Sequence, residues 1–195
     1  MKNCGFMERV GFFLSTLRGK ILDVGFSSGT LHSQVIKKFG GENVTGIDVD
    51  FHRDHRGNYV VASAEKMPLR SASFDSILAG EIIEHLHNPE LFVKESYRVL
   101  KKGGILVMST PNKKSLVNRV FRSYEAPLHF HLFDRGEIES LLGETGFKVK
   151  TFFCLPFTPE SCDGSSMPGL FFLRGFLHHF LPRSLQEDMV IVAEK

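Results

Sequence analysis

The chain has 195 residues, of which 42% are hydrophobic and 24% are charged, values that exclude a disordered or collagen-like protein. Its 24 basic and 22 acidic residues leave a formal net charge of +2, which argues against nucleic acid as a partner. A chain of this length has room for one domain with one core, so residues 1–195 are expected to form a single unit.

The cysteines and the first residues indicate the compartment. Cys4, Cys154 and Cys162 stand at spacings that suit neither a disulfide framework nor a zinc site. The first residues show no secretory signal pattern, and no window reaches the roughly 18 apolar residues that cross a bilayer. The sequence therefore predicts a cytoplasmic protein without a transmembrane segment.

Helical patterns recur along the chain. Phe6, Val10, Phe13 and Leu17 stand at helical spacing and predict a first helix. A second helix is predicted over 31–39, where a glycine pair stops it. Two further helices follow, one that starts at Asn88-Pro89 and stops at Gly103-Gly104, and one that starts at Asp134 with capping-box spacing to Glu137.

Between these helices stand short apolar runs that predict seven strands, at 20–25, 44–49, 59–62, 74–79, 105–108, 147–152 and 189–193. Alternating strands and helices predict an α/β fold with a doubly wound, Rossmann-like sheet that is mostly parallel. The last two runs suggest an antiparallel closing hairpin. Residues 51–57 leave room for little more than one helical turn between the second and third strands.

Known nucleotide-binding loops do not match the turn after the first strand. A dinucleotide fingerprint that starts at Gly25 fails, because Ser27 and Thr30 occupy its second and third glycine positions. A phosphate-binding P-loop also fails, since no Gly-Lys-Ser/Thr follows. An NAD-type oxidoreductase is therefore disfavoured.

Acidic residues and glycines stand at the carboxyl ends of the first two predicted strands, where an open parallel sheet binds its ligand. Gly25 and Gly29 allow a ligand to approach the backbone closely, and the following helix offers free N–H groups to a carboxylate. Asp23 lies on the first strand. Asp48 follows the second strand, where a carboxylate can accept hydrogen bonds from both hydroxyls of a ribose.

Seven short motifs stand in order along the chain: ILDVG at 21–25, GID at 46–48, AEKMPL at 64–69, SFD at 73–75, EIIEHL at 81–86, RVLKKGG at 98–104 and TPN at 110–112. Together they resemble the class I S-adenosylmethionine-dependent methyltransferases, in the small-molecule branch that includes ubiquinone-biosynthesis enzymes. The resemblance covers about residues 19–151 and the final strand. It implies a seven-stranded sheet with an antiparallel last strand, and S-adenosylmethionine as the cofactor.

The resemblance also implies cofactor-binding residues: Asp23, Gly25, Phe26, Ser27 and Gly29 at the methionine end, Asp48 and Val49 at the ribose, Ser63, Ala64 and Glu65 at the adenine, and Gly80 and Glu81 near the sulfonium. Three features depart from the family pattern. Ser27 replaces the usual central glycine, Ser63 replaces an aspartate that often bonds the adenine amine, and the helix after the second strand is nearly absent. The last departure predicts a shallower adenine side.

Methyl transfer to a hydroxyl needs a base, and histidine suits this role near neutral pH. The candidates, in order, are His131, His129 and His85, because the 129–131 segment follows the fifth strand on a loop that often faces acceptors. The alternative is that these histidines are surface or structural residues.

Glu81, Glu84 and His85 form an E-x-x-E-H string. Some relatives bind a divalent metal at such a string together with a later histidine, which His129 or His131 could supply. On a helix this spacing would place the three side chains on one face. The same string is also widespread as a cofactor-side and helix-capping element, and we predict no metal.

Residues 154–187 resemble the family least and include a Phe-rich run at 170–182. The run is too short to span a bilayer. A lid helix over the acceptor, an interfacial segment that reaches a lipid-linked acceptor, and a helix packed on the closing hairpin all fit it. We therefore hypothesise a small-molecule acceptor that is apolar or lipid-linked, with peripheral membrane contact.

The sequence thus predicts an S-adenosylmethionine-dependent methyltransferase that acts on a small molecule, on oxygen, by in-line methyl transfer. A degenerate member that binds the cofactor or a partner without catalysis stays open, because Ser27 and Ser63 depart from the family. An RNA acceptor is disfavoured by the weak charge imbalance.

Overall fold

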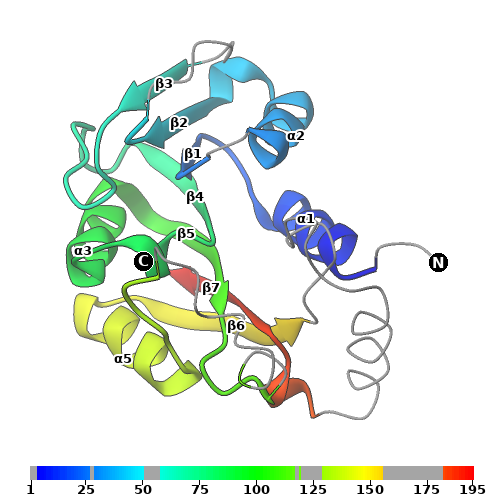
Figure 1. Cartoon of the computed structure of the whole chain (residues 1–195). Helices are drawn as coiled ribbons and strands as arrows, with labels where there is room; N and C mark the ends of the chain where they lie inside the picture. Colours follow the sequence, from blue (N-terminus) through cyan, green and yellow to red (C-terminus); the bar gives the residue numbers. More distant parts are fainter. Residues whose placement is uncertain (1–3, 27–28, 51–57, 117–118, 120–128, 156–181) are drawn as a thin grey trace.

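The computed structural model describes residues 4–26, 29–50, 58–116, 119, 129–155 and 182–195. One seven-stranded sheet runs through it in the order β3-β2-β1-β4-β5-β7-β6 (Figure 1). The strands are β1 (Ile21–Val24), β2 (Val44–Asp48), β3 (Asn58–Val61), β4 (Phe74–Gly80), β5 (Leu100–Pro111), β6 (Lys148–Leu155) and β7 (Asp188–Glu194). Every residue of the central strand β1 is buried, as expected for a strand covered on both faces.

The strand directions place a ligand-binding edge at the centre of the sheet. β1 pairs in parallel with β2 and β4, β2 pairs in parallel with β3, and β4 with β5. β7 runs antiparallel to both β5 and β6, so the predicted mostly parallel sheet with an antiparallel last strand is confirmed. The chain moves outward from β1 to β3 and then returns to β4 on the other side of β1. This reversal creates a switch point between the carboxyl ends of β1 and β4, where open α/β sheets bind ligands.

Helices cover both faces of the sheet, as the doubly wound prediction requires. α1 (Cys4–Thr16) and α2 (Thr30–Phe39) lie on one face, and α3 (Pro89–Val99) and α5 (Arg135–Thr145) lie on the other (Figure 1). Phe13 and Val35 belong to the core under the first pair, whereas Phe92 and Ile138 belong to the core under the second. Short 3-10 turns are η1 (Gly41–Asn43), η2 (Ile83–His85) and η4 (Arg183–Leu185).

The third predicted helix ends earlier than its glycine stop suggested. α3 ends at Val99, and β5 begins at Leu100 instead of 105. Leu100 pairs with Phe74 of β4, and the N–H of Gly103 donates to the carbonyl of Lys195 at 3.0 Å. Partners far along the chain therefore turn this segment into the start of a strand.

Helix starts follow local sequence in one case and tertiary context in the other. The predicted capping box of α5 is confirmed, since Asp134 accepts from the N–H of Glu137 and the Glu137 side chain accepts in return. Pro89 takes the first turn of α3 as predicted. The expected side-chain cap by Asn88 is absent, and its Nδ2 instead donates to the Glu65 carboxylate at 3.2 Å.

Residues 154–187 were predicted to form a lid or acceptor-side insert. Most of this segment, residues 156–181, lies outside the described part of the chain. At its start, Cys154 is buried, and burial raises the pKa of its thiol to about 11, which fits an inert thiol. Within the described ranges, no helix has the length and apolar character needed to span a membrane.

Candidate cofactor and acceptor site

Two neighbouring cavities lie at the switch point and share Gly25 and Glu81. The first, here called the α1 pocket, has a volume of about 190 Å³ and is lined by Arg9, Val10, Phe13, Asp23, Gly25, Phe26, Thr30, Leu31, Gly80, Glu81 and Ser109. The second, here called the β2 pocket, has a volume of about 430 Å³ and is lined by Gly25, Ile47, Asp48, Val49, Asp50, Ala62, Ala64, Glu81, Ile82, His85, Leu86 and Phe130. Together they lie across the ends of β1, β2 and β4.

Gly25 lies where the two pockets meet, and only glycine fits there. Its φ of 69° is in the left-handed region, and a Cβ at this position would lie 2.6 Å from Cδ1 of Ile82. Gly29 is also left-handed, with a φ of 74°, and it precedes the first residue of α2. The two glycines therefore shape the turn from β1 into α2, while Ser27 between them lies outside the described residues.

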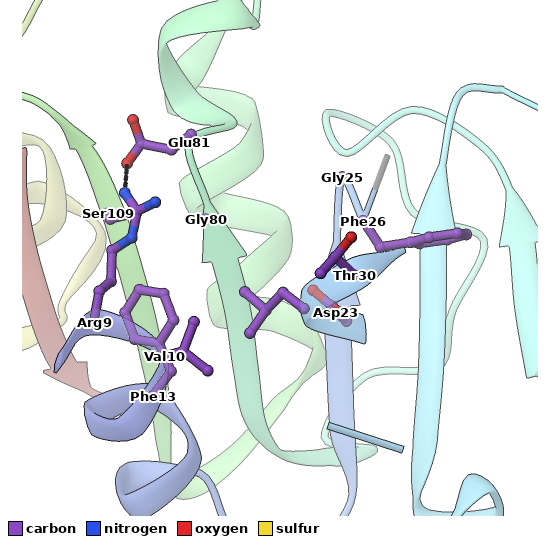
Figure 2. Close-up of a pocket in the computed structure, with 11 residues that line it drawn as sticks. Arg9, Val10, Phe13, Asp23, Gly25, Phe26, Thr30, Gly80, Glu81 and Ser109 are labelled. Atoms are coloured by element: carbon purple, nitrogen blue, oxygen red, sulfur yellow. Dashed lines mark hydrogen bonds and ion pairs between the residues drawn. The ribbon is translucent and has the colours of Figure 1, made fainter. Parts of the chain in front are cut away.

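Arg9 of α1 is a site residue that the sequence analysis missed. Its Nη1 lies 3.2 Å from Glu81 Oε1 (Figure 2) and 3.2 Å from Asp188 Oδ2. Arg9 is separated from these partners by 72 and 179 positions, so local patterns could not reveal the contact. The only sequence signal is a charged residue next to Val10 in an amphipathic helix. This network ties α1 to the end of β4 and closes one side of the α1 pocket.

The ribose candidate Asp48 lines the β2 pocket as predicted. Its Oδ1 accepts from the backbone N–H of Asp50 at 3.0 Å, which fixes the carboxylate at the end of β2. Val49 beside it also lines the pocket and is 66% exposed, an apolar surface open to a ligand.

Of the three predicted adenine-side residues, only Ala64 lines the β2 pocket. Ser63 Oγ accepts from the N–H of Glu65 at 3.1 Å. The Glu65 carboxylate accepts from the backbone and side chain of Asn88, and the backbone bond is the main reason that the pKa of Glu65 is lowered. Glu65 therefore connects two loops, and its carboxylate is engaged away from the pocket.

The E-x-x-E-H string does not form a helical face, which corrects the geometry assumed from its spacing. Glu81 directly follows β4 in a left-handed conformation with a φ of 53°, and Ile83–His85 is a single 3-10 turn. Glu81 therefore points toward Arg9, whereas Glu84 is buried and accepts from Thr110 Oγ1 at 3.0 Å. Burial, followed by the charge of Glu81, raises the pKa of Glu84 well above its usual value.

Two of the three candidate histidines lie together. The Glu84 carbonyl accepts from the N–H groups of Phe130 and His131, which brings the 129–131 segment beside His85. The His85 and His129 rings are 4.8 Å apart and edge-on. Burial, and then the charge of His85, lowers the pKa of His129. His131 instead donates from Nε2 to the carbonyl of His87 at 3.3 Å.

Glu84, His85 and His129 also offer ligand atoms that all lie within 4.8 Å of one another. Glu84 Oε1 and His129 Nδ1 are buried without a hydrogen-bond partner among the described residues. Glu81 and His131 are not part of this group. The prediction of no metal stays a prediction, and this group is the place to test it.

Comparison with known proteins identifies the family. The family model described as "Methyltransferase domain" matches residues 22–108, which include the turn after β1, Asp48 and the Glu84 segment. The ubiquinone biosynthesis O-methyltransferase of Rattus norvegicus mitochondria is 32% identical over 167 residues, covering 73% of this chain and 48% of that protein. Residues 22–108 therefore form a methyltransferase domain, and the chain has the fold of the S-adenosylmethionine-dependent methyltransferases. The cofactor of this family is S-adenosylmethionine, as the resemblance implied.

Other similar proteins agree with this assignment. The ubiquinone biosynthesis O-methyltransferase of Pelagibacter ubique is 36% identical over 105 residues, covering 48% of this chain and 42% of that protein. The crystal structure of a SAM dependent methyltransferase from Archaeoglobus fulgidus shares the fold, with a TM-score of 0.71 and 20% identity over 97% of this chain and 91% of that chain. The chain spans about half the length of the curated relatives it matches.

Proposed function

We propose that this methyltransferase transfers the methyl group of S-adenosylmethionine to an oxygen atom of a small-molecule acceptor. The observation that supports this most directly is the pair of pockets that meet at Gly25 and Glu81. Each pocket accommodates one end of the cofactor, so the sulfonium and its methyl group lie where the two pockets meet. An acceptor can reach that junction from the side of His85 and Phe130, which line the β2 pocket.

The adenosine end belongs in the β2 pocket in this proposal. Asp48 can accept hydrogen bonds from the ribose hydroxyls, and Ile47, Ala62 and Ala64 offer apolar surface to the base. The methionine end belongs in the α1 pocket, where the first turn of α2 at Thr30 offers backbone N–H groups to the carboxylate. Arg9 adds a guanidinium at the far wall of that pocket.

The chemistry needs alignment and one proton acceptor. The acceptor oxygen attacks the methyl carbon as the carbon–sulfur bond breaks, and the sulfur keeps the electron pair and becomes a neutral thioether. The hydroxyl proton passes to a base, and we assign this role to His129 with His85 beside it. The lowered pKa of His129 keeps its imidazole unprotonated near neutral pH, ready to accept. His131 ranks behind them because its ring is engaged with the His87 carbonyl.

The acceptor is proposed to be apolar or lipid-linked. The two relatives described above are named for ubiquinone biosynthesis, and the Phe-rich run at 170–182 of this chain suits an apolar acceptor. Phe130, 51% exposed at the β2 pocket, adds an aromatic surface near the proposed methyl position. Contact with a membrane surface and a cytoplasmic location belong to the same proposal.

Release of S-adenosylhomocysteine tests the proposal. The purified chain is incubated with S-adenosylmethionine and paired acceptors that share a hydroxylated ring and differ only in a long alkyl tail. We expect turnover with both and a lower KM for the tailed member of each pair. Cofactor binding by calorimetry without turnover of any acceptor would instead favour a binding module that lacks catalysis.

A further inference from the structure

His32 lies directly behind the wall of the α1 pocket. Its side chain is 1% exposed and lines neither of the two pockets. It contacts two residues that do line the α1 pocket, Asp23 and Phe26. The position falls on the same face of α2 as the buried Val35, where an apolar residue would be expected. A histidine at this place calls for a reason beyond core packing.

The first contact holds the carboxylate of Asp23. His32 Nδ1 lies 2.8 Å from Asp23 Oδ2, and the two side chains are 0% and 4% exposed. At this distance the nitrogen carries the hydrogen and donates it to the carboxylate. A buried carboxylate without a donor is strongly disfavoured. The bond therefore orients Asp23 and ties the first turn of α2 to the end of β1.

The second contact holds the ring of Phe26. The His32 and Phe26 rings stack with centroids 4.7 Å apart and planes 25° apart. Tyr59 of β3 meets the Phe26 ring edge-on at 5.8 Å. Gly46 of β2 makes room for the stack, because a Cβ there would lie 2.6 Å from the Phe26 ring. Figure 2 shows the Phe26 side chain extending away from Asp23, above the neighbouring strand.

These contacts bear on the backbone that receives the cofactor. The Phe26 carbonyl accepts from the N–H of Gly29 at 2.8 Å, and Gly25 lies between Phe26 and the strand that carries Asp23. A shift of either contact residue would move a left-handed glycine at the pocket. His32 thus contacts Asp23 in β1 and Phe26 after it, from the side opposite the α1 pocket.

We propose that His32 is a positioning residue of this methyltransferase: through Asp23 and Phe26 it holds Gly25 and Gly29 in the conformation that receives the methionine end of the cofactor. This inference rests on the proposed function, because it assumes that the methionine end binds in the α1 pocket.

Two substitutions separate the hydrogen bond from the ring stack. His32→Phe keeps an aromatic ring and removes the donor to Asp23, whereas His32→Asn keeps an N–H donor near the place of Nδ1 and removes the ring. The dissociation constant of S-adenosylhomocysteine is measured by calorimetry on the full chain. We expect it to rise about tenfold or more in His32→Phe and to stay within about threefold of wild type in His32→Asn.

Val35→Ala is the matched control, because Val35 is a buried residue of the same helix in the core beneath α1 and α2. It should lower the melting temperature and leave the dissociation constant unchanged. The inference is overturned if His32→Phe binds like wild type, or if Val35→Ala weakens binding as much as His32→Phe. If the wild-type chain itself does not bind S-adenosylhomocysteine, the proposed function fails and this inference fails with it.

Discussion

Glu84 is a carboxyl group that the protein encloses on nearly every side. Thr110 donates to one of its oxygens, and Glu81 and Asp188 add negative charge nearby. Burial and these charges raise the pKa of Glu84, so the folded chain favours the protonated carboxyl. The unfolded chain has no such preference above 4.5, the usual value for this group. Stability associated with Glu84 is therefore complete below 4.5 and is lost as the pH rises through the raised pKa.

Glu84→Gln should remove this pH dependence, because glutamine keeps the shape of a protonated carboxyl and does not ionise. We subtract the melting temperature of wild type from that of the variant at each pH. This difference should be larger at about pH 8 than at about pH 5, by about 2 °C or more. Differential scanning calorimetry at the two pH values measures this. A relative melting temperature that is the same at both would show that Glu84 titrates normally.

His129 is the second residue whose protonation is decisive. Because its pKa is lowered, the neutral imidazole predominates near pH 7, and the base form is lost only as the pH falls through that lowered pKa. Removing a general base typically reduces the rate by about 10²- to 10⁴-fold. His129→Ala should therefore lower kcat by about 100-fold or more and abolish the acidic limb of the rate profile.

His131→Ala serves as the comparison, since His131 lies two positions away with its ring on the His87 carbonyl. Initial rates of S-adenosylhomocysteine release, measured across pH, should change far less in this variant. A larger loss in His131→Ala than in His129→Ala would restore the order that the sequence suggested.

The turn between β1 and α2 depends on its glycines for geometry. Gly25→Ala would place a Cβ 2.6 Å from Ile82 in a left-handed conformation, which costs about 1–2 kcal/mol even without the clash. We expect the dissociation constant of S-adenosylhomocysteine to rise about tenfold or more, together with a lower melting temperature.

Gly143→Ala is the control for Gly25→Ala, because Gly143 lies inside α5 and a Cβ there meets nothing within 4 Å. Alanine is a better helix former than glycine by about 1 kcal/mol, so this variant should melt higher and bind the cofactor product normally. Equal affinity in both variants would remove Gly25 from the site.

The contact between η2 and the 129–131 segment brings Glu84, His85 and His129 together and makes the absence of a metal testable. We expect none, because strings of this kind are also widespread as cofactor-side elements that hold no metal. Melting temperatures of chelator-treated protein should stay the same when Mg²⁺ or Zn²⁺ is added. A clear rise that disappears in Glu84→Gln would contradict this expectation.

Elements specified by neighbouring residues could be predicted from the sequence. The capping box of Asp134 and Glu137 acts within one turn, and the ILDV run of β1 needs only burial. The start of β5 at Leu100 could not be predicted, because it depends on pairing with Phe74 and Lys195.

In the candidate site, too, features set by nearby residues could be predicted, whereas features set by tertiary contacts could not. Gly25 and Asp48 follow directly from strand ends, so their places were predictable. Arg9 and His32 were missed, since their roles depend on contacts with Glu81 and Asp23 across the fold. The string that ends at His85 would share one face only on a helix, and spacing alone could not reveal the left-handed Glu81 and the single 3-10 turn found there.

In the molecule as a whole, one seven-stranded sheet carries two adjoining pockets at its switch point, and α1 lines one of them. The match spans about half the length of the curated relatives, so the acceptor of the whole protein is part of the proposed function. In the proposed function these pockets bind an adenosyl sulfonium cofactor, with Asp48 at the ribose. A carboxylate that accepts hydrogen bonds from a ligand contributes about 1.5–3 kcal/mol.

Calorimetric titration of the chain with S-adenosylhomocysteine tests that claim most directly, with Asp50→Ala as the matched control because it removes a neighbouring carboxylate of the same pocket. The account predicts one binding site in the wild-type chain, a loss of about tenfold or more in Asp48→Ala, and wild-type affinity in Asp50→Ala. No binding by the wild-type chain, or equal affinity in Asp48→Ala, would contradict it.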